Sequence, residues 1–305
     1  MRIFFNREPV PGPWGGGSKV LTSIIDQCLV RGHEITFDVN SRSNIIFCID
    51  PRPHQNFNFE TLLLMRSRDK SKLVQRIGDL GTHGKPDLFK IVNETNIHAD
   101  HLIFPSNWAK DKLKTEHKNV SVIYNAPLKQ FKIKNSEPDK VSTIPYRIVT
   151  HHWSNNALKG FETYDVLDKF CHESPDHSFT YIGRKPVTSN FRNYIEPQNV
   201  EGLTKEFFKQ NLYLTASKQE AGANHVLEAI AAGLPVIYHK DGGSIVEYCQ
   251  DYGIMYRNDE ELFSILNDYS MLDSLTKNMK KYSRDSTDMA TQYVELIEAI
   301  HENKY

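Results

Sequence analysis

The sequence of 305 residues contains little cysteine and no long apolar run. Its four cysteines, Cys28, Cys48, Cys171 and Cys249, are scattered without the short spacings of a metal site, so we expect reduced, buried thiols. No segment reaches the length that a membrane-spanning helix needs. The first residues, MRIFFN, predict a strand and not a signal peptide, because the apolar run is short and no cleavage site follows. These absences predict a soluble, cytoplasmic protein.

An excess of either charge is also absent: the formal net charge is −1. This balance gives no general attraction to nucleic acid or to an anionic membrane, and we expect no nucleic-acid partner. One local exception is the basic run over residues 66–76. Either it is a solvated face, or it is a landing site for an anionic acceptor or a lipid headgroup. The chain is long enough for two domains of ordinary size.

The most informative stretch is residues 218–236, KQEAGANHVLEAIAAGLPV. The apolar runs on both sides of it predict two buried strands of a parallel sheet. Between them, Glu220 falls in a loop at the carboxyl end of the first strand. Glu228 lies one or two turns into a helix that stops at Gly233. Carboxyl ends of strands are where open α/β sheets bind ligands.

The residue types of this stretch suit a phosphorylated ligand. The small residues around Gly222 let backbone amides approach an anion, and the helix N-terminus adds a partial positive charge. A carboxylate further along, such as that of Glu228, accepts hydrogen bonds from sugar or ribose hydroxyls. The pattern by itself is equally compatible with a helix-terminal acid in an ordinary α/β unit.

The rest of the chain alternates strand-like runs with amphipathic segments, which predicts an α/β fold. A loop rich in proline and glycine, with Gly15, Gly16 and Gly17, opens a helix over residues 18–30. This loop either cradles a phosphate or a sugar, or is a flexible turn. In the following part we expect short strands over residues 35–39, 45–49, 62–65 and 73–77. The polar residues 128–145 predict a linker.

The sequence EAGANHVLEAIAAGLPV resembles the paired-glutamate motif of retaining GT-B glycosyltransferases of the family-4 type (glycosyl transferases group 1), with a consensus of roughly E-G-F-G-x-P-x-x-E-A-M-A-x-G-x-P-V. Glu220 and Glu228 stand at the family spacing. Ala223 follows the glycine where the family has an aromatic side chain, and His225 replaces the usual proline. The resemblance implies an α/β, GT-B fold, in which two Rossmann-like doubly wound domains face a central cleft.

The resemblance also implies a division of the chain. We expect an N-terminal acceptor-side domain over residues 1–127, the linker 128–145, a nucleotide-sugar-binding domain over residues 146–285, and a C-terminal helix over residues 286–305. That helix either crosses back to the first domain or simply ends the chain. In the family, the loop of Gly15 to Gly17 lies at the interdomain cleft.

Donor contacts can be carried over position by position. Lys159 matches the lysine of the family turn G-R-x-x-x-x-K-G, where arginine and lysine neutralise the donor diphosphate. The arginine is missing here, so further charge has to come from elsewhere, and His152 and Arg184 are the candidates. By carry-over, Glu228 holds the ribose hydroxyls and Glu220 lies against the donor sugar. The other donor-binding candidates are Gly222, Ala223 and Asn224.

By the same resemblance, the catalytic candidates are Glu220 and, on the acceptor side, His83, because a histidine at about this place in the family sits by the reacting sugar. Without the resemblance, His83 is an ordinary loop residue between two glycines after a strand. The chain has no Asp-x-Asp pair, so we expect neither a bridging metal nor a cofactor. Cations and a helix N-terminus would instead stabilise the leaving diphosphate. No residue presents itself as a covalent nucleophile.

The resemblance implies a hexosyltransferase-like enzyme that moves a sugar from a nucleotide-sugar to a glycan or lipid-linked saccharide, with retention of configuration, in polysaccharide biosynthesis. It would work in the cytoplasm, either free or in weak association with the inner membrane. Two alternatives stay open: a non-catalytic GT-B subunit that binds a partner transferase or a glycan, and a GT-B nucleotide-sugar epimerase. Turnover, as opposed to binding alone, separates the enzymes from the subunit.

Overall fold

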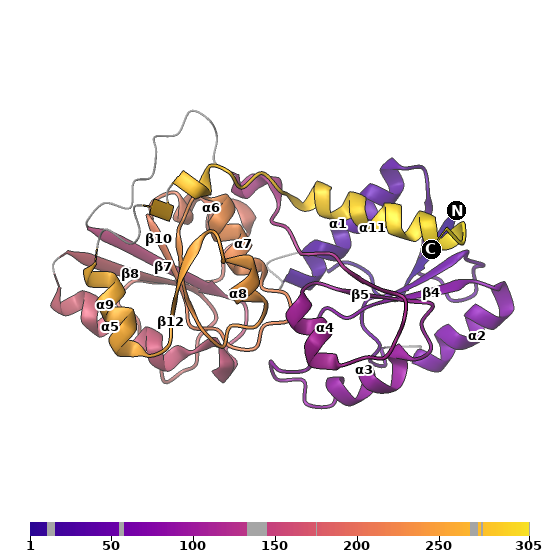
Figure 1. Ribbon diagram of the computed structural model, residues 1–305, viewed down its shortest axis with the longest axis horizontal. Coiled ribbons are helices and arrows are strands. Elements are labelled where there is room, and N and C mark those ends of the chain that lie inside the picture. The colour runs from indigo at the N-terminus through magenta and orange to yellow at the C-terminus, as the bar shows by residue number, and fades with distance from the viewer. Residues whose placement is uncertain are drawn as a thin grey trace. The chain divides into compact units, whose positions relative to one another are not determined.

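The chain forms two compact units in the computed structural model (Figure 1). The residues that the structure describes are 1–10, 16–54, 58–132, 145–174, 176–268, 274–275 and 277–304. The first unit consists of Met1–Pro11, Gly17–Asn125 and Ser286–Tyr305, and the second of Gly12–Gly16 and Ala126–Asp285. Each unit is built on one six-stranded parallel sheet with helices on both faces.

The sheet of the first unit has the strand order β2-β1-β3-β4-β5-β6. Its strands are β1 (Arg2–Phe5), β2 (Glu34–Thr36), β3 (Ile45–Cys48), β4 (Lys72–Arg76), β5 (His101–Phe104) and β6 (Val120–Val122). Its helices are α1 (Gly16–Val30), α2 (Phe59–Asp69), α3 (Leu88–Asn96), α4 (Asn107–Leu113) and α11 (Ser286–His301). Helices α1 and α11 cover one face, and α2 and α3 cover the other (Figure 1).

The alternation of side chains along β3 explains why both faces of this sheet are covered. Successive residues of a strand point to opposite faces, and all four residues of β3 are buried apolar side chains. Ile46 and Cys48 belong to the cluster that contains Leu62 of α2. Phe47 points the other way and meets the ring of Tyr293 on α11, with ring centroids 6.2 Å apart. A strand buried on both faces therefore joins the two helix layers.

The sheet of the second unit has the strand order β12-β11-β10-β7-β8-β9. Its strands are β7 (Tyr146–His152), β8 (His177–Gly183), β9 (Tyr194–Ile195), β10 (Leu212–Thr215), β11 (Val236–His239) and β12 (Gly253–Tyr256). Its helices are α5 (Phe161–Glu173), α6 (Val200–Phe207), α7 (Asn224–Ala231), α8 (Ser244–Tyr248) and α9 (Asp259–Asn267), with 3-10 turns η1 (Lys129–Phe131) and η2 (Ala157–Lys159). Helices α5 and α9 pack in one core with β7, β8 and β10.

Two local predictions differ from the structure. Residues 62–65, predicted as a strand, lie inside helix α2, because a short apolar run fits a buried strand and a helix equally well. The helix signal was the capping box, in which Asn58 and Thr61 satisfy each other's backbone amides.

In the predicted glycine loop, Gly16 and Gly17 form the first turn of α1, and Gly15 lies outside the described residues. Most of the predicted linker, residues 133–144, lies outside them as well.

Three further observations concern the described residues. None of their helices is long and apolar enough to cross a bilayer. All four cysteines are buried and carry free thiols. No histidine, cysteine, aspartate and glutamate side chains among these residues gather into a group that could hold a metal ion.

Candidate functional site

The candidate site of the second unit forms where β7 and β10 end. The two strands are parallel neighbours, with Tyr213 opposite Val149, so their carboxyl ends meet at one edge of the sheet. Lys159 follows β7 in the short turn η2, and Glu220 follows β10 in the loop before α7. The amide of Lys218 donates to the carbonyl of Leu158 at 2.8 Å, which ties the two loops together. Parallel pairing therefore brings together two loops that are distant in the sequence.

Lys159 and Glu220 form an ion pair at the centre of this edge. The Nζ atom of Lys159 lies 2.5 Å from Oε1 of Glu220, and the two side chains are 12% and 13% exposed. Gly160 allows this approach: its φ is +80°, and a Cβ atom there would stand 2.5 Å from the carbonyl oxygen of Ala216. Only glycine takes such a φ without strain. The turn that carries Lys159 can thus lie directly on the end of β10.

The backbone of Glu220 is fixed by the loop after β11. Its N–H donates to the carbonyl of Gly242 at 3.2 Å, and its carbonyl accepts from the N–H of Ser244 at 2.8 Å. Between these two residues Gly243 has φ +69°, and a Cβ atom there would lie 2.5 Å from the carbonyl oxygen of Glu220. Glycine is therefore required at position 243 by the close passage of the Glu220 backbone.

Glu228 lies deeper, on the buried side of α7. It is 2% exposed, and its Oε2 lies 3.0 Å from Nε2 of His151, the penultimate residue of β7. The other ring nitrogen, Nδ1, lies 3.1 Å from the hydroxyl oxygen of Tyr213 on β10. With the proton on Nε2, the imidazole donates to the carboxylate and accepts from the tyrosine. A buried carboxylate is thus held by a hydrogen-bonded partner, as its desolvation requires.

Two other histidines around this chain of hydrogen bonds contact aromatic or hydroxyl groups. Nε2 of His152 lies 2.7 Å from the hydroxyl of Tyr164, which also accepts from the N–H of Ala216 at 2.9 Å. Nε2 of His225 lies 3.1 Å from the hydroxyl of Thr215. Burial lowers the pKa of His225 to about 3 and raises the pKa of Tyr164 to about 12. Both groups are therefore uncharged at neutral pH.

The small residues before α7 are less open to a ligand than their size suggests. The N–H of Ala223 donates to Oγ of Ser244 at 3.0 Å, so this amide already has a partner. Two polar atoms nearby are different: Oδ1 of Asn224 and Oγ of Ser217 are buried without a hydrogen-bond partner in the described part of the chain. Buried polar atoms are normally satisfied, so these two mark a place that a ligand could complete.

Arg184 and His83 come from other places. Arg184 follows β8 directly; its side chain is exposed, and its N–H donates to the carbonyl of His152 at 2.9 Å. His83 belongs to the first unit, in the loop between β4 and α3. In that loop Asp79 accepts from the N–H of Gly81 at 2.8 Å and pairs with Lys85 at 2.6 Å. Gly222 is partly exposed within the Glu220 loop.

The sequence analysis missed the residues that support the two glutamates. His151 and Tyr213 hold Glu228, and Ser217 presents an unsatisfied hydroxyl, but none of them belongs to a recognisable motif. One signal was available for His151, a polar side chain at the end of an apolar strand. Its partner could not be identified, because β7 and β10 are neighbours only in the folded sheet.

Comparison with solved structures finds the same fold in several proteins. WaaG, involved in lipopolysaccharide biosynthesis, superposes with a TM-score of 0.67 at 14% identity, over 97% of this chain and 99% of that one. Sucrose-phosphate synthase from Thermosynechococcus elongatus superposes with a TM-score of 0.71 at 13% identity, over 99% of this chain and 100% of that one. HepE from Anabaena in complex with UDP-glucose superposes with a TM-score of 0.69 at 14% identity, over 98% of this chain and 99% of that one. The chain has the GT-B fold.

The predicted GT-B fold, with two doubly wound α/β units, is therefore confirmed. No family model matches the sequence, and no curated protein does. At these identities the likeness concerns the fold, so the roles of Lys159, Glu220, Glu228 and the other site residues stay predictions.

Proposed function

We propose that this protein is a glycosyltransferase that moves a sugar from a nucleotide-sugar to a glycan or lipid-linked saccharide. The observation that carries the proposal is the pairing of Lys159 with Glu220 at the carboxyl ends of β7 and β10, on a GT-B fold. This edge is where doubly wound sheets bind nucleotides. A lysine and a carboxylate in contact there supply a partner for phosphate and a partner for sugar hydroxyls.

The first step is binding of the donor diphosphate. Its oxygens compete with Glu220 for the Nζ atom of Lys159, because phosphate and carboxylate are equivalent partners for an ammonium group. The exposed Arg184, at the end of the neighbouring strand β8, supplies a second cation. In this scheme the diphosphate takes Lys159 and leaves the carboxylate of Glu220 to the donor sugar. His152 does not contact the donor in this scheme. It is hydrogen-bonded to the Tyr164 hydroxyl and helps to hold the site in place from below.

The nucleoside and the sugar use the deeper groups. Glu228, oriented by His151, accepts hydrogen bonds from the ribose hydroxyls. The unsatisfied Oδ1 of Asn224 and Oγ of Ser217 take further hydroxyl groups of the donor. Gly222 gives the sugar room beside Glu220, and His83 is the candidate on the acceptor side.

The reaction breaks the bond between the anomeric carbon and the diphosphate oxygen. An acceptor hydroxyl forms the new glycosidic bond, and the products are the glycoside, the nucleoside diphosphate and one proton. Retention of configuration and a reaction without a metal are proposed on the family resemblance. HepE was solved with UDP and with UDP-glucose, which makes UDP-sugars the first donors to try here.

Calorimetric titration of the purified protein with UDP-, GDP-, ADP-, TDP- and CMP-linked sugars tests the donor site. We expect one nucleotide class to bind saturably. The variant Glu228→Gln, which keeps the size of the side chain, should weaken binding at least tenfold. The matched control is Glu162→Gln, an exposed carboxylate on α5 of the same unit, which should bind as the native protein does. No binding to a folded protein by any donor would refute the proposal.

A non-catalytic subunit is the second candidate, and one observation favours it. Lys159 is already neutralised by Glu220, so a diphosphate has to displace this carboxylate before it can contact the lysine. Release of nucleoside diphosphate from the bound donor, measured with and without saccharide acceptors, separates the candidates. Acceptor-dependent release supports the transferase, and binding without release supports the subunit. Conversion of the donor sugar to its epimer in the absence of acceptor would identify the epimerase.

A further inference from the structure

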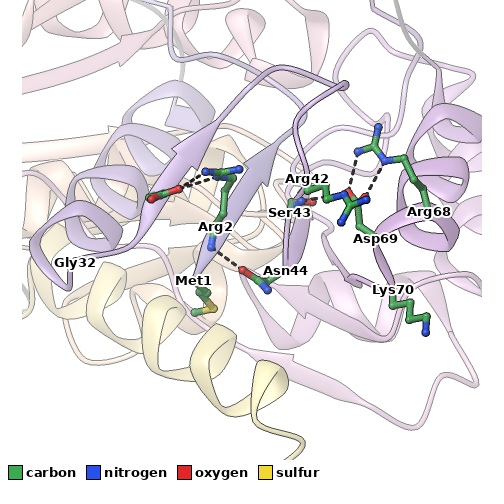
Figure 2. A pocket seen from close by; sticks show the side chains of 10 residues that line it. Met1, Arg2, Gly32, Arg42, Ser43, Asn44, Arg68, Asp69 and Lys70 are labelled. Atoms are coloured by element: carbon green, nitrogen blue, oxygen red, sulfur yellow. Dashed lines mark hydrogen bonds and ion pairs between the residues drawn. The ribbon is translucent and has the colours of Figure 1, made fainter.

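The basic run of the sequence ends in an arginine whose surroundings differ from those of the others. Arg66 pairs with Asp100 at 2.7 Å. Arg68 pairs with Asp69 at 2.7 Å, and Figure 2 shows this pair in a pocket beside the amino-terminal ends of the strands. Arg76, the last residue of β4, lies at the opposite edge of the sheet and is 4% exposed. No carboxylate of the described residues pairs with it.

Two hydrogen bonds fix the orientation of the Arg76 guanidinium group. Its Nε donates to the hydroxyl of Tyr293 on α11 at 2.9 Å, and its Nη2 donates to Oδ1 of Asn125, which follows β6, at 3.0 Å. Both partners are uncharged, and they use only two of the five N–H donors of the group. The other terminal nitrogen, Nη1, has no hydrogen bond within the described part of the chain. Buried charges are normally paired, so this arginine lacks an anionic partner.

Gly78 shows where such a partner has access to the arginine. A Cβ atom at this position would overlap Nη1, so glycine is what leaves room for the end of the guanidinium group. Gly78 is partly exposed and lies in the loop between β4 and α3, which also carries His83. The next residue, Asp79, pairs with Lys85 at 2.6 Å and does not neutralise the arginine. Nη1 therefore lies beside a surface loop at the edge of the sheet where α/β folds bind ligands.

We propose that Arg76 binds an oxyanion of the acceptor, so that the acceptor is an anionic saccharide. This rests on the proposed function, in which the first unit receives the acceptor. A guanidinium group donates parallel hydrogen bonds to two oxygens of a carboxylate or a phosphate. One uncompensated charge matches one negative charge, which is carried by the carboxylate of an acidic sugar and by a phosphodiester. Tyr293 and Asn125 hold the group in place in advance, which lowers the entropy lost on binding.

The test compares the full-length native protein with the variant Asn125→Asp. This change keeps the size of the side chain and gives the guanidinium group an internal carboxylate in place of the amide. The matched control is Asn58→Asp, which adds the same charge at the exposed N-cap of α2, where aspartate caps a helix as well as asparagine does. Backbone amide NMR shifts are followed at constant ionic strength with methyl glucuronide, dimethyl phosphate and uncharged methyl glucoside.

We expect a saturable shift of the Gly78 amide with an anionic probe and none with methyl glucoside. The affinity should fall at least tenfold in Asn125→Asp and stay unchanged in Asn58→Asp. Tighter binding of methyl glucuronide indicates an acidic sugar, and tighter binding of dimethyl phosphate indicates a phosphodiester. If the Gly78 amide of the native protein responds to neither anion, the proposal is overturned. It is also overturned if Asn125→Asp folds and binds the anion as before, because Arg76 then only ties α11 to the sheet.

Donor titration at the second unit separates this inference from the proposed function. A protein that binds a donor but no anion at Gly78 refutes the inference and keeps the transferase. A protein that binds the anion but no donor refutes the transferase and keeps the anion site. With an anionic acceptor and turnover, Asn125→Asp should raise the acceptor KM at least tenfold and leave the donor affinity unchanged.

Discussion

Gly243 is the position where a single methyl group should disturb the candidate site most. Its φ of +69° and ψ of −125° lie in a region that L side chains rarely adopt. Holding an alanine there costs about 1–3 kcal/mol. The new Cβ atom would also stand 2.5 Å from the carbonyl oxygen of Glu220 and 2.8 Å from its nitrogen, and both are backbone atoms that cannot rotate away. We therefore expect Gly243→Ala to lower the free energy of unfolding of the second unit by about 2–3 kcal/mol.

The same substitution should displace Glu220. The hydrogen bond from the Ser244 amide to the Glu220 carbonyl has to lengthen or break, so hydrogen exchange of that amide should become faster. Because Glu220 then no longer stands where the donor sugar is proposed to bind, donor affinity should fall by about tenfold, or about 1.4 kcal/mol. Urea unfolding, hydrogen exchange and donor titration measure the three effects.

The matched control is Gly17→Ala, the same chemical change in a different environment. Gly17 lies in the first turn of α1, and a Cβ atom there would meet nothing within 4 Å. Alanine in a helix is more favourable than glycine, so this variant should be more stable by about 0.5–1 kcal/mol. If Gly243→Ala unfolds like the native protein and keeps the slow exchange of Ser244, the reasoning from close packing is refuted.

Two further predictions concern the first unit. The guanidinium of the buried Arg76 donates to the Tyr293 hydroxyl at 2.9 Å and to the Asn125 amide oxygen at 3.0 Å, so Tyr293→Phe should cost about 1–3 kcal/mol by urea unfolding. The same change in an Arg76→Met background should cost much less, and an equal cost there would show that the hydrogen bond is not the cause. Burial lowers the pKa of His101 to about 4, below its unfolded value, so its contribution to stability is present above pH 6.5 and is lost as the pH falls toward 4. Between pH 7 and 4.5 the native protein should lose about 2 kcal/mol more than His101→Gln does, and parallel curves would contradict this.

The sequence by itself determined the local elements around the site. The apolar runs, the glycine after the helix and the proline that follows predicted β10, α7 and β11 almost as they are. Glu220 therefore falls in the loop and Glu228 on the helix, as expected. Such signals are local, because they come from backbone conformation and from the period of burial within one segment. Where a short run fitted two structures, as at residues 62–65, the prediction was wrong.

Only the tertiary structure decided which side chains meet. Lys159 reaches Glu220, and His151 reaches Glu228, because β7 and β10 pair in parallel although α5, β8 and α6 separate them in the sequence. Strand order is set by how all the helices and strands bury their apolar faces together, and no single segment contains that information.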